Sequence, residues 1–227
     1  MLSNDLRVVP MTSQAAFRLP PGLYAICDDG LCPELSLERK SELLLRGGVQ
    51  VIQLRIKRAG SREALAAARR ISSLCRDAAA MCLLNDRVDL ALIAGAHGVH
   101  LGEDDLPPRR ARALLGPEKI IGVTVRNLEQ ARAAQDAGAD YVGLGPVFPT
   151  ATKRVDAPVL GIDAFERIAR QSPLPTVAIS GIGLSNIARV ARAGAHGAAV
   201  ASDLLTAADI SARARALSAA FAGGRDP

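Results

Sequence analysis

Two basic side chains alternate at the end of one apolar segment, in the run Gln53-Leu54-Arg55-Ile56-Lys57. In an extended strand, residues two apart face the same side, so Arg55 and Lys57 can point toward one ligand. Arginine offers a planar fork of donors and lysine a compact charge, and together they suit a diphosphate. The alternative is that both charges lie in a solvated loop, and the run taken alone favours neither interpretation.

Acidic residues follow two further apolar segments. Asn85 and Asp86 come directly after residues 81–84, and Asp105 ends the acidic run that follows His100-Leu101-Gly102. An acid at such a place can also cap the next helix and interact with its dipole, so a single aspartate indicates little. The presence of Asp86 and Asp105 at the ends of neighbouring strands favours an oxygen-rich Mg2+ site that shares its shell with substrate phosphates.

Three segments in the second half of the chain have the composition of anion-binding loops. Residues 145–153 are too rich in proline and glycine for a helix, and they carry two threonine hydroxyls beside a lysine. Residues 180–183 and Ala201-Ser202 end two successive apolar segments with small residues, whose backbone N–H groups can approach a phosphate. The sequence therefore predicts a second anion site, distant in the chain from the basic pair.

The three histidines have patterns typical of structural residues. His97 and His196 each follow an Ala-Gly-Ala turn that ends a predicted helix immediately before a strand. We expect His100 to pack or to orient a neighbour. No arrangement of His or Cys in the sequence suggests a nucleophile and its base.

These segments can meet only if the chain places the ends of several strands side by side. Short aliphatic runs alternate with longer stretches of Ala, Leu and Arg that have a helical period, a pattern typical of parallel βα units. Eight strands are predicted, at residues 23–27, 51–54, 81–84, 98–101, 120–123, 141–144, 176–179 and 197–201. Eight helices are predicted, at residues 35–46, 62–79, 88–94, 107–115, 128–137, 162–171, 184–193 and 210–220.

Eight strands that each precede a helix predict an α/β protein with a single (β/α)8 TIM barrel. An open doubly wound sheet is the alternative, but Cys27-Asp28-Asp29-Gly30 stands after the first strand, where a G-x-G-x-x-G turn would be expected. In a barrel the active site lies at the C-terminal ends of the strands, where the polar residues described above fall. We expect one catalytic domain at residues 19–227, preceded by an N-terminal arm at residues 1–18.

Length and composition restrict the class of protein. With 227 residues, of which 49% are hydrophobic, the chain can bury one large core. The sequence has no apolar run long enough for a membrane span, and its start lacks the pattern of a signal peptide, so we expect a cytoplasmic protein with no membrane partner. The four cysteines lack a C-x-x-C spacing and are expected to be reduced thiols.

The formal net charge of +5 suits either nucleic acid or small phosphorylated substrates. Only 3% of the residues are aromatic, which leaves few side chains to stack on bases. We therefore expect small phosphorylated substrates and no nucleic acid. Much of the arginine excess lies in predicted helices, at Arg69, Arg70, Arg109, Arg110, Arg112, Arg132, Arg189 and Arg192.

Five separated segments together resemble the motifs of the thiamine-phosphate synthase family. They occur in the order and spacing of that family, between residues 23 and 205. They are Gln53-Leu54-Arg55-Ile56-Lys57, residues 85–91, His100-Leu101-Gly102 with Asp105-Leu106-Pro107, residues 143–153, and Ser180-Gly181-Ile182. The resemblance implies a barrel enzyme that joins hydroxymethylpyrimidine diphosphate to thiazole phosphate, with release of pyrophosphate and with Mg2+ as cofactor.

The resemblance also implies roles for individual residues. The implied ligands of the pyrimidine diphosphate are Gln53, Arg55, Lys57, Asn85, Thr124 and Lys153. The implied ligands of the thiazole phosphate are Thr150, Thr152, Gly181, Ala201 and Ser202, and those of the metal are Asp86 and Asp105. Arg55, Lys57 and Lys153 are expected to stabilise the departing diphosphate. No general base is needed, because the attacking thiazole nitrogen carries no proton.

Five positions depart from the usual family pattern. Ile56 replaces the usual acidic residue, Glu103 the usual glutamine, and Thr124 the usual serine. Ser180 replaces the usual glycine, and Arg126 stands where a histidine often occurs. Two alternatives remain open. One is a thiazole tautomerase, which is expected to use a histidine at the position of Arg126, and the other is a non-catalytic barrel that binds a phosphorylated ligand. The retained cations and acids favour the synthase, and the sequence does not decide between a monomer and a homodimer.

Overall fold

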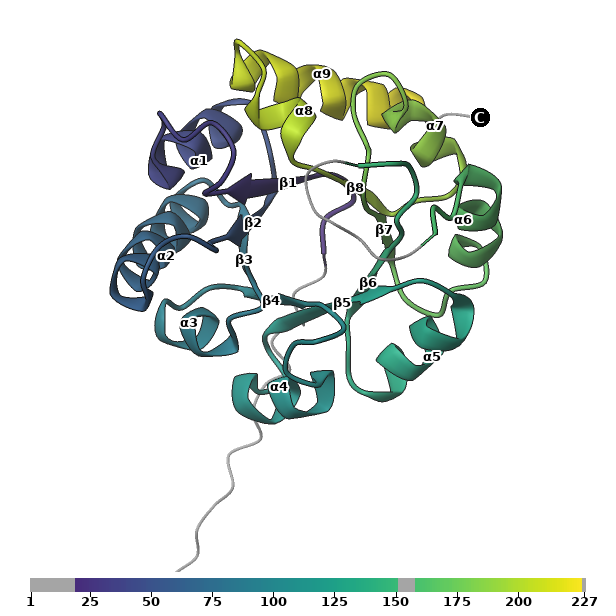
Figure 1. The fold of residues 1–227 in the computed structure, drawn as a ribbon, viewed down its shortest axis with the longest axis horizontal. Helices are drawn as coiled ribbons and strands as arrows, with labels where there is room; N and C mark the ends of the chain where they lie inside the picture. Colours follow the sequence, from purple (N-terminus) through teal and green to yellow (C-terminus); the bar gives the residue numbers. More distant parts are fainter. Residues whose placement is uncertain (1–18, 151–157, 226–227) are drawn as a thin grey trace, which may run out of the picture.

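A computed structural model describes residues 19–150 and 158–225 of the chain. Eight parallel strands form a closed barrel in sequence order, because β1 pairs with both β2 and β8 (Figure 1). The strands are β1 (Gly22–Asp28), β2 (Val51–Arg55), β3 (Met81–Asn85), β4 (Gly98–Leu101), β5 (Ile120–Val125), β6 (Tyr141–Leu144), β7 (Thr176–Ala178) and β8 (Gly197–Val200). The predicted (β/α)8 barrel is confirmed.

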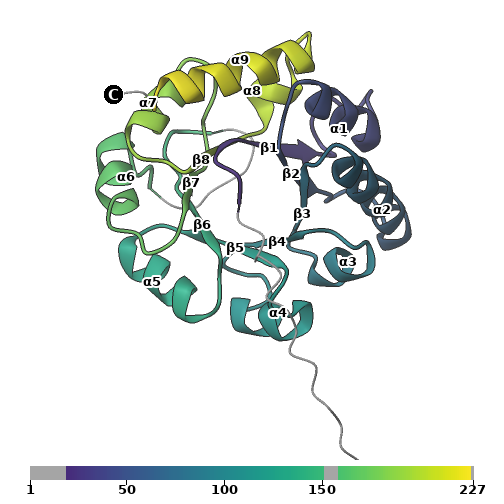
Figure 2. The ribbon, with the colours of Figure 1, turned by 180° about the vertical axis from the view of Figure 1, so that it is seen from behind.

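Helices surround the barrel (Figure 2). Those from α1 to α7 connect successive strands, and α8 and α9 follow β8. They are α1 (Leu37–Arg46), α2 (Ser61–Asp77), α3 (Val88–Ile93), α4 (Pro108–Leu115), α5 (Leu128–Asp136), α6 (Ile162–Ala169), α7 (Ile187–Arg192), α8 (Ser202–Leu205) and α9 (Ile210–Gly223). Side chains begin several of them: Ser36, Asn127 and Asp209 each accept a hydrogen bond from a first-turn N–H.

Most element bounds differ from the predicted ones by one to three residues, and two differences have a clear cause. The helix predicted over residues 184–193 begins only at Ile187, because the Asn186 side chain accepts from the Gly183 N–H and donates to the Gly181 carbonyl. These bonds hold the preceding residues in a turn. Helix α8 was not predicted, since its four residues are too few to show a helical period.

The core has two layers, one on each face of the strands. Between sheet and helices lies the larger cluster, with fully buried residues such as Ile52, Ile71 and Phe165. Inside the barrel lies a smaller cluster, which includes Tyr24 and Tyr141. Because neighbouring residues of a strand face opposite sides, the strands other than β4 contribute to both clusters, while β4 contributes Val99 and Leu101 to the larger one.

Three of the four cysteines, Cys27, Cys75 and Cys82, are buried free thiols, and Cys32 is half-buried and also free. Burial raises the pKa of the Cys27 thiol to about 12, so this group stays protonated at neutral pH. In the described part of the chain, no helix combines the length and the apolar character required to cross a bilayer.

Close approach of β4 and β5 depends on a glycine. A Cβ at position 98 would lie 1.9 Å from the Ile120 carbonyl oxygen of the paired strand, so Gly98→Ala should lower the free energy of unfolding by at least about 2 kcal/mol. Gly223→Ala is the matched control, because a Cβ there meets no atom within 4 Å and alanine favours the helix. Urea unfolding measures both variants, and equal stabilities would contradict the packing argument.

Candidate functional site

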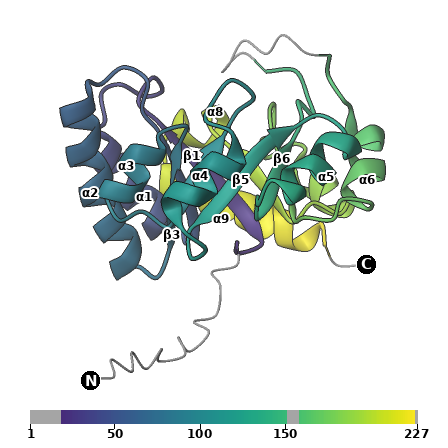
Figure 3. The same ribbon diagram turned by 90° about the horizontal axis from the view of Figure 1, so that it is seen from below.

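A cavity of about 560 Å³ opens at the C-terminal ends of the strands. Its lining includes Ser202, the first residue of α8. Helix α8 lies at the upper rim of the barrel in the side view (Figure 3). The predicted site residues within the described part of the chain all line this cavity: Gln53, Arg55, Lys57, Asn85, Asp86, Asp105, Thr124, Thr150, Gly181, Ala201 and Ser202. Thr152 and Lys153 lie outside the described residues.

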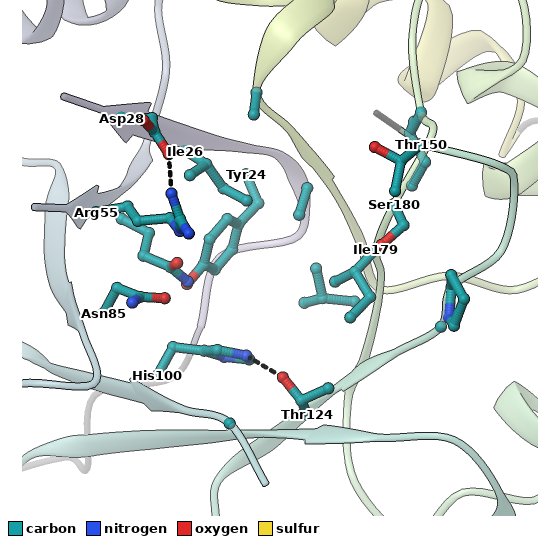
Figure 4. Close-up of a pocket in the computed structure, with 18 of the residues that line it drawn as sticks. Tyr24, Ile26, Asp28, Arg55, Asn85, His100, Thr124, Thr150, Ile179 and Ser180 are labelled. Carbon is teal, nitrogen blue, oxygen red and sulfur yellow. Dashed lines mark hydrogen bonds and ion pairs between the residues drawn. The ribbon is translucent and has the colours of Figure 1, made fainter. Parts of the chain in front are cut away.

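Two aspartates at the end of β1 position the basic pair that follows β2. The Asp28 carboxylate accepts from the Arg55 guanidinium at 2.6 Å (Figure 4). The Asp29 carboxylate accepts from the backbone N–H groups of Lys57 and Arg58, at 2.9 and 2.7 Å. Arg55 is thereby aimed into the cavity, and the backbone that carries Lys57 is fixed.

A buried lysine supports the β1–α1 loop. Lys40 is 1% exposed, and its ammonium donates to the carbonyl oxygens of Asp28 and Leu31. A buried ammonium needs such partners, because an unpaired charge away from water is costly. Lys40 therefore ties helix α1 to the strand end that presents Asp28.

The two predicted metal ligands lie together at the ends of β3 and β4. Asp86 has a left-handed backbone (φ 64°), and its carboxylate forms an ion pair with Lys57. The N-cap position of helix α3 is occupied by Arg87, and Asp86 precedes it. The Asp105 carboxylate accepts from the Gly102 N–H at 2.6 Å.

Burial raises the pKa of the Asp105 carboxyl, and the neighbouring Asp86 carboxyl raises it further. The part of this pKa shift that comes from Asp86 reflects repulsion between the two carboxylates, which a bound cation would relieve. The hard oxygen donors of this pair fit Mg2+. Among the described residues, no group of three or more His, Cys, Asp or Glu could hold a metal ion, so water and phosphate would have to complete the shell.

A chain of hydrogen-bonded side chains crosses the floor of the cavity. Gln53 donates to the Tyr24 hydroxyl at 2.7 Å, and the Tyr24 and Tyr141 hydroxyls lie 2.7 Å apart. The His100 ring joins Tyr141 to Thr124, with both hydrogen bonds at 2.9 Å. Figure 4 shows the bond between His100 and Thr124. His100 is therefore an orienting residue, as the sequence indicated, and it holds the Thr124 side chain.

The opposite wall is formed by turns after β6 and β7. Ser180 and Gly181 have left-handed backbones, with φ 74° and 68°, so Ser180 adopts a conformation that favours the glycine usual at its position. A Cβ on Gly181 would lie 2.4 Å from the Pro149 carbonyl oxygen. The absence of a side chain at Gly181 thus lets the loop that carries Thr150 pack against β7.

Two departures from the family pattern occur as a pair at the mouth of the cavity. Arg126 and Glu103 form an ion pair at 2.9 Å, which links the loops after β5 and β4. A third departure, Ile56, packs against the core outside the barrel instead of lining the cavity. The departure at position 56 therefore lies outside the cavity lining.

The comparisons with known proteins agree with this geometry. The thiamine monophosphate synthase family matches residues 23–204. The chain belongs to this family. It is 59% identical over 215 residues to the thiamine-phosphate synthase of Myxococcus xanthus, covering 95% of this chain and 99% of the relative. It is 52% identical to that of Anaeromyxobacter dehalogenans, covering 79% of this chain and 80% of the relative.

Solved structures give the same result. The thiamine phosphate pyrophosphorylase of Pyrococcus furiosus superposes with a TM-score of 0.82 at 36% identity, covering 90% of this chain and 97% of that one. A 3-hexulose-6-phosphate synthase superposes with a TM-score of 0.63 at 19% identity and shares the fold. The chain is thus similar in three dimensions to a solved thiamine phosphate pyrophosphorylase with which it shares 36% of its residues.

Several residues that build the site were missed by sequence reasoning. Asp28, Asp29, Tyr24 and Tyr141 were not singled out, although strand alternation places Tyr24 and Asp28 on the same face of β1. That alternation was the signal that could have found them. Lys40 gave no signal, since a lysine in a helical pattern is ordinarily solvent-exposed.

Asp86→Asn should lower the pKa of the Asp105 carboxyl toward its ordinary range, because it removes the adjacent negative charge. Burial remains, so the pKa should stay above the ordinary value. NMR titration of the carboxyl carbons in metal-free protein measures the change. Asp104→Asn, at an exposed neighbouring acid, should have a smaller effect. An unchanged Asp105 pKa in Asp86→Asn would refute the proposed interaction of the two acids.

Proposed function

We propose that this protein transfers the hydroxymethylpyrimidine group from its diphosphate to thiazole phosphate, giving thiamine phosphate and pyrophosphate. The observation that carries the proposal is that one cavity contains a basic pair, two adjacent carboxylates and, on its opposite wall, small-residue turns. Two phosphorylated reactants need two such regions facing each other. Membership of the thiamine monophosphate synthase family supports the same reaction.

The pyrimidine diphosphate is assigned to the side formed by β2, β3 and β5. Its proposed ligands are Gln53, Arg55, Lys57, Asn85, Thr124 and, outside the described residues, Lys153. Arg55 is held by Asp28, so its planar fork is already oriented when a diphosphate arrives. Arg55, Lys57 and Lys153 would stabilise the negative charge that develops on the leaving diphosphate.

Asp86 and Asp105 are the proposed ligands of Mg2+. When bound, the ion would neutralise charge on the diphosphate oxygens and complete its shell with water and phosphate. Lys57, which pairs with Asp86 in this structure, would be shared between the acid and the substrate. The two aspartates therefore serve the same leaving group as the basic pair.

The thiazole phosphate is assigned to the opposite wall, with Thr150, Thr152, Gly181, Ala201 and Ser202 as its proposed ligands. Support comes from the position of α8, which begins at Ser202 directly after β8. In barrels of this type, a phosphate commonly lies between the loops after strands 7 and 8 and the start of a short extra helix. The phosphate would thus orient the thiazole ring toward the pyrimidine.

The reaction requires little from the protein beyond orientation and charge. The bond between the pyrimidine methylene and the diphosphate oxygen breaks, and its electron pair leaves with the diphosphate. The thiazole nitrogen then donates its lone pair to the resulting cation. Because that nitrogen carries no proton, no general base is needed. Holding both reactants in one cavity supplies proximity.

The two alternatives predict different behaviour. A tautomerase is expected to use a histidine where Arg126 stands, and here that position carries a guanidinium paired with Glu103. A binding barrel would not convert its ligand.

We propose that residues 19–227 form the catalytic domain and that residues 1–18 are an arm. We also propose that the enzyme acts in the cytoplasm on small phosphorylated substrates.

Purified protein should release pyrophosphate only when both substrates and Mg2+ are present. The double variant Asp86→Asn, Asp105→Asn should lower kcat/KM by at least about 100-fold, since metal stabilisation of a developing charge contributes several kcal/mol. The control is Asp77→Asn, Asp163→Asn, which removes two exposed acids outside the cavity and should change kcat/KM less than about three-fold.

The outcomes separate the candidates. Turnover that needs both substrates and is lost only in the cavity variant supports the synthase and its metal ligands. Absence of turnover, with thiazole phosphate still bound, would overturn the proposal in favour of a tautomerase or a binding barrel.

A further inference from the structure

The hydrogen-bonded chain in the cavity floor connects two proposed ligands of the pyrimidine substrate. Its ends, Gln53 and Thr124, lie on β2 and β5, and both line the cavity. Tyr24, Tyr141 and His100 lie between them, joined by four hydrogen bonds of 2.7 to 2.9 Å. The donor or acceptor state of each end is thus linked to that of the other.

The Gln53 amide sets the direction of these hydrogen bonds, because each hydroxyl has only one proton to donate. The Gln53 amide N–H donates to the Tyr24 oxygen, so the Tyr24 proton is directed to Tyr141. Tyr141 then donates its own proton to Nδ1 of His100. The proton of a neutral His100 must therefore be on Nε2, where it donates to the Thr124 oxygen.

This direction fixes both ends of the chain. The Gln53 carbonyl oxygen remains as an acceptor for a ligand, and the Thr124 hydroxyl proton remains as a donor. Reversal would require the Gln53 amide to turn over, both phenols to rotate and His100 to change tautomer. Because the chain is continuous, no single group can reverse alone without leaving two donors or two acceptors in contact.

The barrel is shaped to admit the central part of the chain. In register, Gly122 of β5 lies between His100 of β4 and Tyr141 of β6. A Cβ on Gly122 would lie 2.0 Å from the Tyr141 ring, and one on Gly143 would lie 2.9 Å from the His100 ring. Two strands thus omit side chains where the tyrosine and histidine rings must pass.

Burial keeps the two phenols neutral. Tyr24 and Tyr141 are 3% and 0% exposed, and burial raises the pKa of each hydroxyl above its ordinary value. Each hydroxyl therefore retains the proton that the chain requires across the neutral pH range.

We infer that Tyr24, Tyr141 and His100 are positioning residues, which make Gln53 an acceptor and Thr124 a donor toward the pyrimidine ring. The assignment of that ring to this end of the cavity rests on the proposed function, whereas the direction of the chain does not. A ligand edge that presents a donor to the Gln53 carbonyl oxygen and an acceptor to the Thr124 hydroxyl complements these two groups. An edge with donor and acceptor exchanged does not.

The tautomer of His100 is the direct test of direction. The protein contains three histidines, so 15N NMR of histidine-labelled protein gives few signals. The variant His100→Asn identifies the signals of His100. We expect the proton on Nε2 and none on Nδ1. A proton on Nδ1 would mean that the chain is reversed or that His100 is charged, and either result would overturn the inference. This measurement needs no substrate.

The role in substrate recognition is tested by a double-mutant cycle. Tyr141→Phe removes the middle hydroxyl of the chain, and Thr124→Val removes its end. Each should lower kcat/KM for the pyrimidine diphosphate about 10-fold, with KM for thiazole phosphate changed less than about two-fold. Because Tyr141 acts through Thr124, kcat/KM of the double variant should fall about 10-fold, whereas two independent effects would multiply to about 100-fold.

Thr176→Val is the matched control. It also removes one buried hydroxyl from a barrel strand, but Thr176 does not line the cavity, and its hydroxyl bonds only to the Leu174 carbonyl among the described residues. It should leave kcat/KM unchanged. Losses that multiply in the cycle, or an equal loss in Thr176→Val, would overturn the positioning role. Inactive wild type would overturn the proposed function, while the tautomer measurement would still decide the direction of the chain.

Discussion

Pairing of β1 with β8 closes the sheet, and this closure brings side chains from all parts of the sequence into one interior. Along each strand every second residue faces inward, so the interior set is determined once the register is set. Apolar residues such as Leu83 and Ile120 fill the interior below the cavity, and polar residues line the cavity at the C-terminal ends of the strands. The cavity is therefore the upper continuation of the same interior packing that holds the barrel together.

The ends of the strands were accessible to sequence reasoning because they combine two local signals. An apolar run marks the strand, and the polar residue that follows marks the rim, as at Asn85 and Asp86 after β3. Parallel strands place all such ends on one side, so residues found one by one along the chain could be assigned to a common site. The barrel and most of the cavity residues followed from this pattern, whereas Thr124 was assigned only through the family resemblance.

Contacts across the barrel could not be derived in the same way. Tyr24 and Tyr141 are 117 residues apart, and their hydrogen bond depends on the ring orientations and on the space left by Gly122. The Asp28 carboxylate likewise acts through Arg55 on a neighbouring strand. Such pairings depend on packing and on strand register, neither of which has a local signature in the sequence.

The ion pair of Arg126 with Glu103 has a consequence for how related chains diverge. Each residue departs from the family pattern, and each provides the partner of the other across two loops. A change at one position alone would leave the charge of the other unmatched at the cavity, whereas a joint change would keep the local charge balanced. The two positions are therefore expected to covary among homologues, so that an arginine at position 126 occurs together with an acid at position 103.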